Sequence, residues 1–195
     1  ATVTYVTTLK PRGILATMRA TKTTCMLGVP TLYSMLRDYI DRKVLRVGQS
    51  AFKASLASRT KKLSRRFERR FSRNVGRRLF PKVHDEFGGH IRVFVSGGSA
   101  LGEKLFDDFK VLGIPIYEGY GLTETAPVLT VSPLFRCRSK SAGRPLPGVE
   151  IRIDHPDKDG IGEIIVRSPS LMREYYSNPA ATRAVMKEGW FHTGD

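Results

Sequence analysis

The chain has 195 residues, of which 41% are hydrophobic and 26% charged, enough length and apolar content to bury a sizeable core. It has no run of about 18 apolar residues and no pattern of a cleavable secretory signal, so the sequence predicts neither a membrane span nor secretion. The net charge of +15 attracts phosphates, acidic lipid or nucleic acid. Cys25 and Cys137 stand far apart, and the four histidines lack metal-ligand spacing, which favours a cytoplasmic protein with reduced thiols over a disulfide framework or a zinc site.

The first part of the chain alternates strand and helix patterns. Residues 1–6 (ATVTYV) predict a buried or half-buried strand, Pro11 opens a helix, and residues 23–29 (TTCMLGV) predict a second strand. Apolar residues then recur at helical spacing directly after Pro30, which predicts a helix over 31–44. This order indicates the beginning of an α/β fold.

A strongly basic segment follows. Between Lys53 and Arg78 lie eleven basic residues and one acid, Glu68. Apolar residues recur there in steps of four or seven, which predicts an amphipathic basic helix within about residues 50–80, packed on a core with its basic face in solvent. Peripheral contact with an anionic membrane or another protein is one alternative. A nucleic-acid-binding module is another, and it is not expected because packing alone explains the apolar stripe.

The middle of the chain repeats the strand and helix order. The apolar runs 91–95 (IRVFV) and 114–117 (IPIY) each precede a glycine-containing turn, and a helical pattern separates them. Right-handed crossovers place such turns at the carboxyl ends of parallel strands, where ligands bind. We therefore expect an α/β fold with a parallel sheet and flanking helices over 1–138. Short alternating stretches then predict a small β-rich subdomain over 139–195.

The strongest single motif is 120–125 (YGLTET), preceded by Glu118 and Gly119 at a predicted strand end. Backbone amides, a hydroxyl and a carboxylate within one loop suit a phosphate group and its magnesium ion. Taken alone, however, a Thr-Glu-Thr sequence more often caps a helix. The motif therefore needs its context.

That context is a resemblance to the adenylate-forming superfamily, which includes acyl-CoA synthetases, luciferases and nonribosomal peptide adenylation domains. The string YGLTET closely resembles the central motif of this superfamily. Four further strings resemble its motifs in the same order: 96–101 (SGGSAL), 141–148 (SAGRPLPG), 162–164 (GEI) with 173–179, and 189–195 (GWFHTGD). The Val29-Pro30 turn and the long basic insert are most similar to long-chain fatty acid-CoA ligases.

The resemblance implies an ATP-dependent ligase that converts a fatty acid to acyl-AMP and then, with coenzyme A, to acyl-CoA. It implies that Thr123 contacts the α-phosphate region and that Glu124 holds Mg²⁺, both as catalytic residues. Asp195 would accept hydrogen bonds from the ribose hydroxyls, and Tyr120 would stack on the adenine. The full set of residues implied for the nucleotide is Gly97, Gly98, Ser99, Glu118, Gly119, Tyr120, Gly121, Thr123 and Asp195.

The identity of the acid stays open, because an aryl, amino or short-chain acid would use the same motifs. The helix after Val29-Pro30 either walls an acyl channel or contributes ordinary core through Leu32, Tyr33 and Leu36. The resemblance also implies a phosphate-gripping loop with a lysine, a hinge and a C-terminal lysine, none of which occurs in this sequence. We therefore expect an incomplete central fragment that does not turn over at a useful rate by itself.

Overall fold

The computed structural model describes residues 2–45, 73–133 and 137–195. Most of the predicted basic helix lies outside these residues, and only its last part is seen, in α4 (Arg73–Leu79). The chain divides into two compact units, Ala1–Tyr117 and Glu118–Asp195. The boundary between these units falls inside strand β3 (Ile116–Tyr120). The sequence placed a division after residue 138, where a β-rich subdomain was expected to begin, and that division stays a prediction.

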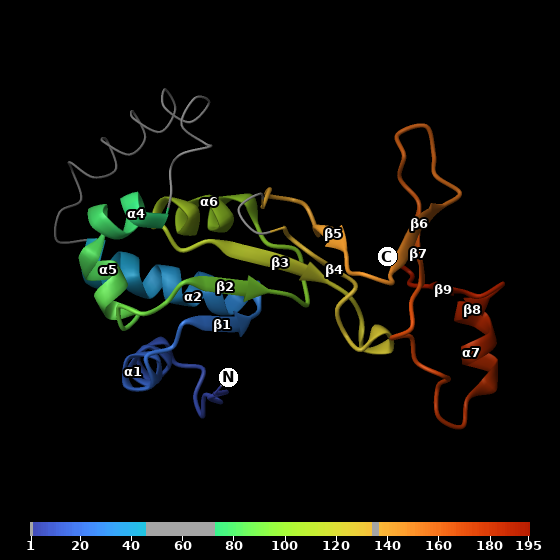
Figure 1. The fold of residues 1–195 in the computed structure, drawn as a ribbon, viewed down its shortest axis with the longest axis horizontal. Coiled ribbons are helices and arrows are strands. Elements are labelled where there is room, and N and C mark those ends of the chain that lie inside the picture. The colour runs from blue at the N-terminus through green and yellow to red at the C-terminus, as the bar shows by residue number, and fades with distance from the viewer. Residues whose placement is uncertain (1, 46–72, 134–136) are drawn as a thin grey trace. The chain divides into compact units, whose positions relative to one another are not determined.

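The first unit is built on parallel strands (Figure 1). β1 (Cys25–Gly28) pairs in parallel with β2 (Val93–Ser96), from Cys25 opposite Val93 to Gly28 opposite Ser96. The backbone N–H of Phe94 donates to the carbonyl of Pro115 at 3.0 Å, which sets the chain leading into β3 beside β2. The predicted parallel sheet is therefore present, with its glycine-rich turn at the carboxyl end of β2.

Helices accompany these strands: α1 (Pro11–Thr21), α2 (Pro30–Ile40) continued by a π-helical turn (Asp41–Leu45), α4, α5 (Pro81–Glu86) and α6 (Glu103–Val111). Proline occupies the first turn of α1, α2 and α5, where its missing N–H costs no helical hydrogen bond. The helix expected over 31–44 is confirmed. Among the described residues, no helix has the length and apolar character needed to cross a membrane.

An aromatic cluster forms the core of this unit. Phe94 of β2 stacks on Tyr33 of α2 with ring centroids 4.9 Å apart. The rings of Phe87, directly after α5, and Phe109 of α6 meet the Phe94 ring edge-on, with ring centroids 5.5 and 5.4 Å from it. All four side chains are fully buried. Leu32 and Leu36 are buried as well, as the core interpretation of the helix after Pro30 expects, while a role in walling an acyl channel stays a prediction.

The predicted N-terminal strand is wrong. Residues 2–6 have no strand pairing, and the side chains of Val3 and Tyr5 are 70% and 87% exposed. Alternating β-branched residues provide a strand pattern, but a strand also needs hydrogen bonds from a neighbour, and no described strand pairs with this segment.

The second unit is antiparallel throughout its described strands. β3 pairs with β4 (Thr130–Val131), which pairs with β5 (Arg144–Pro145). A four-stranded sheet follows in the order β6-β7-β9-β8, within the β-rich segment that the sequence predicts. Its strands are β6 (Glu150–Asp154), β7 (Glu163–Arg167), β8 (Met186–Lys187) and β9 (Trp190–His192), and α7 (Pro179–Val185) precedes β8.

Packing in this sheet differs between its two faces. Val166 and Phe191, which are paired across β7 and β9, are buried to 0% and 2% exposure. Trp190 points to the other face, where the guanidinium groups of Arg152 and Arg167 lie over its ring at 4.5 and 4.6 Å from the centroid. Core packing on one face and the two arginines stacked on Trp190 on the other thus fix the register of the strands.

Candidate functional site

The loop after β3 is folded by a buried hydroxyl. The backbone N–H of Leu122 donates to Thr125 Oγ1 at 2.9 Å, and this hydroxyl lies 2.8 Å from the Leu122 carbonyl that accepts from it. Residues Thr123–Thr125 form a single 3₁₀ turn, in which Thr125 is completely buried. The alternative was that Thr-Glu-Thr caps a helix; in the structure Thr125 instead closes a single 3₁₀ turn by accepting from the Leu122 N–H. Thr123 is exposed on the same turn and stays the candidate for phosphate contact.

The fold itself requires glycine at position 121, where the resemblance also implies contact with the nucleotide. A Cβ atom at this position would overlap the backbone of Pro127, so only glycine permits this close approach. The carbonyl of Tyr120 accepts a hydrogen bond from the N–H of Leu129 at 2.8 Å, which closes the loop. The loop is consequently compact and set by its own backbone.

Glu124 is held in place by the segment that follows β7. Its backbone carbonyl accepts from the N–H of Met172 at 2.7 Å, and its Oε1 accepts from the hydroxyl of Tyr175 at 2.9 Å. This hydrogen bond raises the pKa of Tyr175. Within the part of the chain that the structure describes, Oε2 of Glu124 has no hydrogen-bond partner. One carboxylate oxygen is thus fixed while the other can serve a hard cation, which fits the Mg²⁺ role implied for this residue.

Tyr120 and Asp195, which the sequence predicts for one nucleotide, are in direct contact. The Tyr120 hydroxyl donates to Asp195 Oδ2 at 2.7 Å across 75 positions of sequence. Burial and the nearby carboxylate raise the pKa of Tyr120 to about 12, so the hydroxyl remains a proton donor at neutral pH. Among the described residues Oδ1 of Asp195 has no partner, so the carboxylate keeps acceptor capacity for hydroxyl groups.

The turn that carries Asp195 is bonded to β7. The N–H and the hydroxyl of Thr193 donate to the Ile164 carbonyl at 3.2 and 2.7 Å, and the Ile164 N–H donates to the Asp195 carbonyl at 3.0 Å. Gly194 between them has a φ of +77°, a left-handed conformation that favours glycine. The strings at 162–164 and 192–195 are therefore structural partners, which gives a physical reason for their occurrence together.

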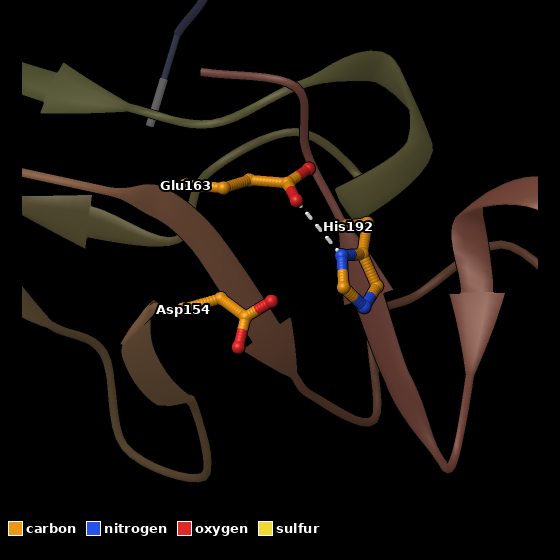
Figure 2. A group of neighbouring side chains, drawn as sticks. All are labelled: Asp154, Glu163 and His192. Atoms are coloured by element: carbon orange, nitrogen blue, oxygen red, sulfur yellow. Dashed lines mark hydrogen bonds and ion pairs between the residues drawn. The ribbon is translucent and has the colours of Figure 1, made fainter. Parts of the chain in front are cut away.

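Three polar side chains gather beside this turn: Asp154 from β6, Glu163 from β7 and His192 from β9 (Figure 2). One potential metal-ligand atom from each residue lies within 4.8 Å of those of the other two. Glu163 Oε2 lies 2.9 Å from His192 Nδ1, and its Oε1 accepts from the Gly194 N–H at 2.9 Å. These hydrogen bonds, that of His192 first, lower the pKa of Glu163. Both oxygens of Glu163 are thus already engaged within the protein.

Sequence spacing could not find this cluster, because its members come from three strands and His192 has no second histidine near it. Tyr175 was missed for the same reason, since nothing local links it to Glu124. The signal in the sequence that could have placed Glu163 near His192 was that the strings 162–164 and 192–195 occur together.

Further predicted site residues lie in strands and turns. Glu118 and Gly119 belong to β3, where the Glu118 carbonyl accepts from the N–H of Ser132 at 2.8 Å. Gly97, Gly98 and Ser99 belong to the first unit and follow β2 directly. The roles assigned to these five residues at the nucleotide stay predictions.

Comparison with known proteins shows the family. A sequence model described as "AMP-binding enzyme" matches residues 1–176, and the chain belongs to this AMP-binding enzyme family. It is 29% identical over 192 residues to the long-chain-fatty-acid–CoA ligase FadD15 of Mycobacterium bovis, which covers 94% of this chain and 31% of that ligase. It is 37% identical over 124 residues to the long-chain-fatty-acid–[acyl-carrier-protein] ligase AEE15 of Arabidopsis thaliana, covering 60% of this chain and 17% of that protein.

Among solved structures, an anthranilate CoA ligase in complex with anthranoyl-AMP superposes with a TM-score of 0.68. It is 20% identical and covers 100% of this chain and 31% of that one, so it shows the shared fold. The chain therefore spans about a third or less of the length of these relatives.

Proposed function

We propose that the chain is part of an ATP-dependent long-chain fatty acid–CoA ligase and supplies the ribose-binding and cation-binding groups of its nucleotide site. The observation that carries the proposal is the hydrogen bond of 2.7 Å between Tyr120 and Asp195, which joins two separate motifs. Two fatty acid ligases among the relatives support the class of acid.

In the first half-reaction a carboxylate oxygen of the fatty acid attacks the α-phosphorus of ATP, and the bond from that phosphorus to the bridging oxygen of the β-phosphate breaks. The products are acyl-AMP and pyrophosphate. Asp195 orients the ribose by accepting hydrogen bonds from its hydroxyls. The Tyr120 hydroxyl holds the Asp195 carboxylate in place. Thr123 offers its exposed hydroxyl to the α-phosphate region. Mg²⁺, when bound at Glu124, offsets negative charge on the phosphates.

In the second half-reaction the thiol of coenzyme A loses its proton to solvent, its thiolate sulfur attacks the acyl carbonyl carbon, and the bond to the AMP oxygen breaks to release AMP. Orientation is the contribution expected from the described groups, since a fixed ribose sets the α-phosphate relative to the acid. The pyrophosphate leaving group needs positive charge from elsewhere in the protein.

Pyrophosphate release tests the proposal, measured on the complete protein that contains this chain with fatty acids of increasing length. Activity that rises from short to long chains and requires ATP supports it. Glu124→Gln should lower the rate strongly, whereas Glu174→Gln, the same change at an exposed residue of the neighbouring segment, should leave it unchanged. No release with any fatty acid would sink the assignment of substrate.

A ligase for an aryl acid is the second candidate, because the anthranilate CoA ligase shares the fold over the whole chain. Benzoate and anthranilate in the same pyrophosphate assay separate the two candidates. Faster release with these acids than with long-chain fatty acids would favour the second.

A peripheral contact of a cytoplasmic protein with anionic membrane is a separate proposal, supported by the eleven basic residues between Lys53 and Arg78. Cosedimentation with phosphatidylserine vesicles at low salt should retain the protein, while neutral phosphatidylcholine vesicles should not. Absence of binding to either would leave this segment as scaffold. Binding to double-stranded DNA with a steep salt dependence would favour the nucleic-acid alternative instead.

A further inference from the structure

Glu163 bridges the two sides of the turn that presents Asp195. Its Oε1 accepts from the Gly194 N–H and its Oε2 pairs with His192 Nδ1, each at 2.9 Å (Figure 2). His192 and Gly194 flank Thr193, so one carboxylate grips the turn both before and after that residue. No other described side chain accepts a hydrogen bond from the Gly194 N–H.

The turn needs this grip because of Gly194. A glycine with φ of +77° has wide conformational freedom. Its neighbours are held by main-chain and hydroxyl bonds to Ile164 and Thr193, and the side chain of Asp195 by Tyr120. Loss of the Glu163 carboxylate would leave the Gly194 N–H without this acceptor and loosen the Thr193–Gly194 peptide, which precedes Asp195. The bonds of Asp195 to Thr193 Oγ1, Ile164 and Tyr120 would remain, so we expect a shift in the orientation of Asp195 and not its release.

A cation site is the competing interpretation of the same residues. Asp154, Glu163 and His192 offer three ligand atoms, but Glu163 already spends both oxygens on Gly194 and His192. Asp154 pairs with His155 at 3.0 Å. The hydrogen bonds to Gly194 and His192 account for the position of the Glu163 carboxylate without a metal, so the geometry favours a structural clamp.

We propose that Glu163, acting with His192, is the positioning residue that holds Asp195 in the orientation required to recognise the ribose of ATP. The inference rests on the proposed function, because it assigns ribose recognition to Asp195. Glu163 acts on the nucleotide only through the turn. Its loss should therefore change discrimination between ribose and deoxyribose more than it changes binding of the rest of the nucleotide.

The test compares ATP with 2′-deoxy-ATP and 3′-deoxy-ATP as substrates for acyl adenylation by the complete protein. The parent and Asp195→Asn establish how much kcat/KM depends on the ribose hydroxyls and Asp195. Glu163→Ala should reduce that discrimination about tenfold, because the hydrogen bond that it removes holds the turn to a charged carboxylate. Glu150→Gln changes a carboxylate on the adjacent strand β6 and should leave the ratio as in the parent.

Glu163→Gln adds a readout that general destabilisation would not give. Its amide oxygen can still accept from the Gly194 N–H, while its NH₂ group replaces the carboxylate oxygen that lies opposite His192 Nδ1. Discrimination by this variant should therefore lie between that of the parent and that of Glu163→Ala, a partial rescue that depends on the hydrogen bond to Gly194.

Each outcome decides something. If the parent does not distinguish ATP from the deoxy analogues, the assignment of ribose to Asp195 fails and the proposed function must be revised. If the parent distinguishes them and Asp195→Asn does not, while both Glu163 variants keep the parental ratio, the positioning role is refuted. Should Glu163→Ala lose the folded fluorescence of Trp190, the ratio measured for Glu163→Gln against the parent carries the test.

Discussion

Replacing Thr125 by valine should destabilise the second unit, whereas the same replacement at Thr123 should not. The Thr125 hydroxyl is fully buried and satisfies the N–H of Leu122 at 2.9 Å. Valine keeps the shape but leaves this N–H without an acceptor, which costs about 1–3 kcal/mol, and the added methyl group recovers part of it, up to about 1 kcal/mol. The net loss expected is therefore about 1–2 kcal/mol. Thr123 is exposed, and such a substitution is usually neutral within about 0.5 kcal/mol.

Trp190 provides the assay, because it is the single tryptophan and lies buried in the same unit. Urea unfolding followed by its fluorescence should give a lower midpoint for Thr125→Val, and thermal unfolding a melting temperature lower by about 2–8 °C. Thr125→Ser keeps the hydroxyl and should recover part of the loss. Thr123→Val should unfold like the parent but adenylate poorly. Equal midpoints for the two valine variants would refute the structural division between these threonines.

Three further perturbations probe other contacts. Tyr175→Phe removes the hydroxyl that orients Glu124 and should raise the Mg²⁺ concentration for half-maximal adenylation about tenfold with little change in stability; an unchanged Mg²⁺ titration would contradict this. Burial lowers the pKa of His84, so as pH falls through the ordinary histidine pKa of 6.5 the unfolded chain takes up a proton before the folded chain does. Thermal unfolding followed by circular dichroism should therefore show stability falling below that pH in the parent and falling less in His84→Gln. Parallel curves for the two proteins would show that His84 does not cause the pH dependence. Phe94→Ala, at the centre of the aromatic core, should cost about 3–5 kcal/mol in urea unfolding, and a loss under 1 kcal/mol would contradict the packing described.

Local patterns predicted much of the fold. The short apolar runs became β1 and β2, and the helical pattern expected between residues 95 and 114 became α6, whose Phe106 and Phe109 are buried. Such predictions succeed because side-chain periodicity records which face of an element meets the core. Residues 2–6 show the limit, since their strand pattern lacks a described neighbour to pair with.

The candidate site was predictable residue by residue but not as a set of contacts. The resemblance assigned Tyr120 and Asp195 to one nucleotide, and their hydrogen bond agrees with this. It gave no role to the side chains of Glu163 or Tyr175, whose partners depend on the register of β7 with β9 and on the path of the chain after β7. Contacts of this kind join positions far apart in sequence, where neither spacing nor propensity carries information.

Acid-dependent exchange of labelled pyrophosphate into ATP, measured without coenzyme A, tests the central claim most directly. Exchange occurs only when a protein makes acyl-AMP reversibly. The complete protein that contains this chain should show exchange with long-chain fatty acids, and Asp195→Asn should reduce it strongly. Nucleotide binding with no exchange for any fatty, aryl, amino or short-chain acid would contradict the account of this chain as part of an adenylate-forming ligase.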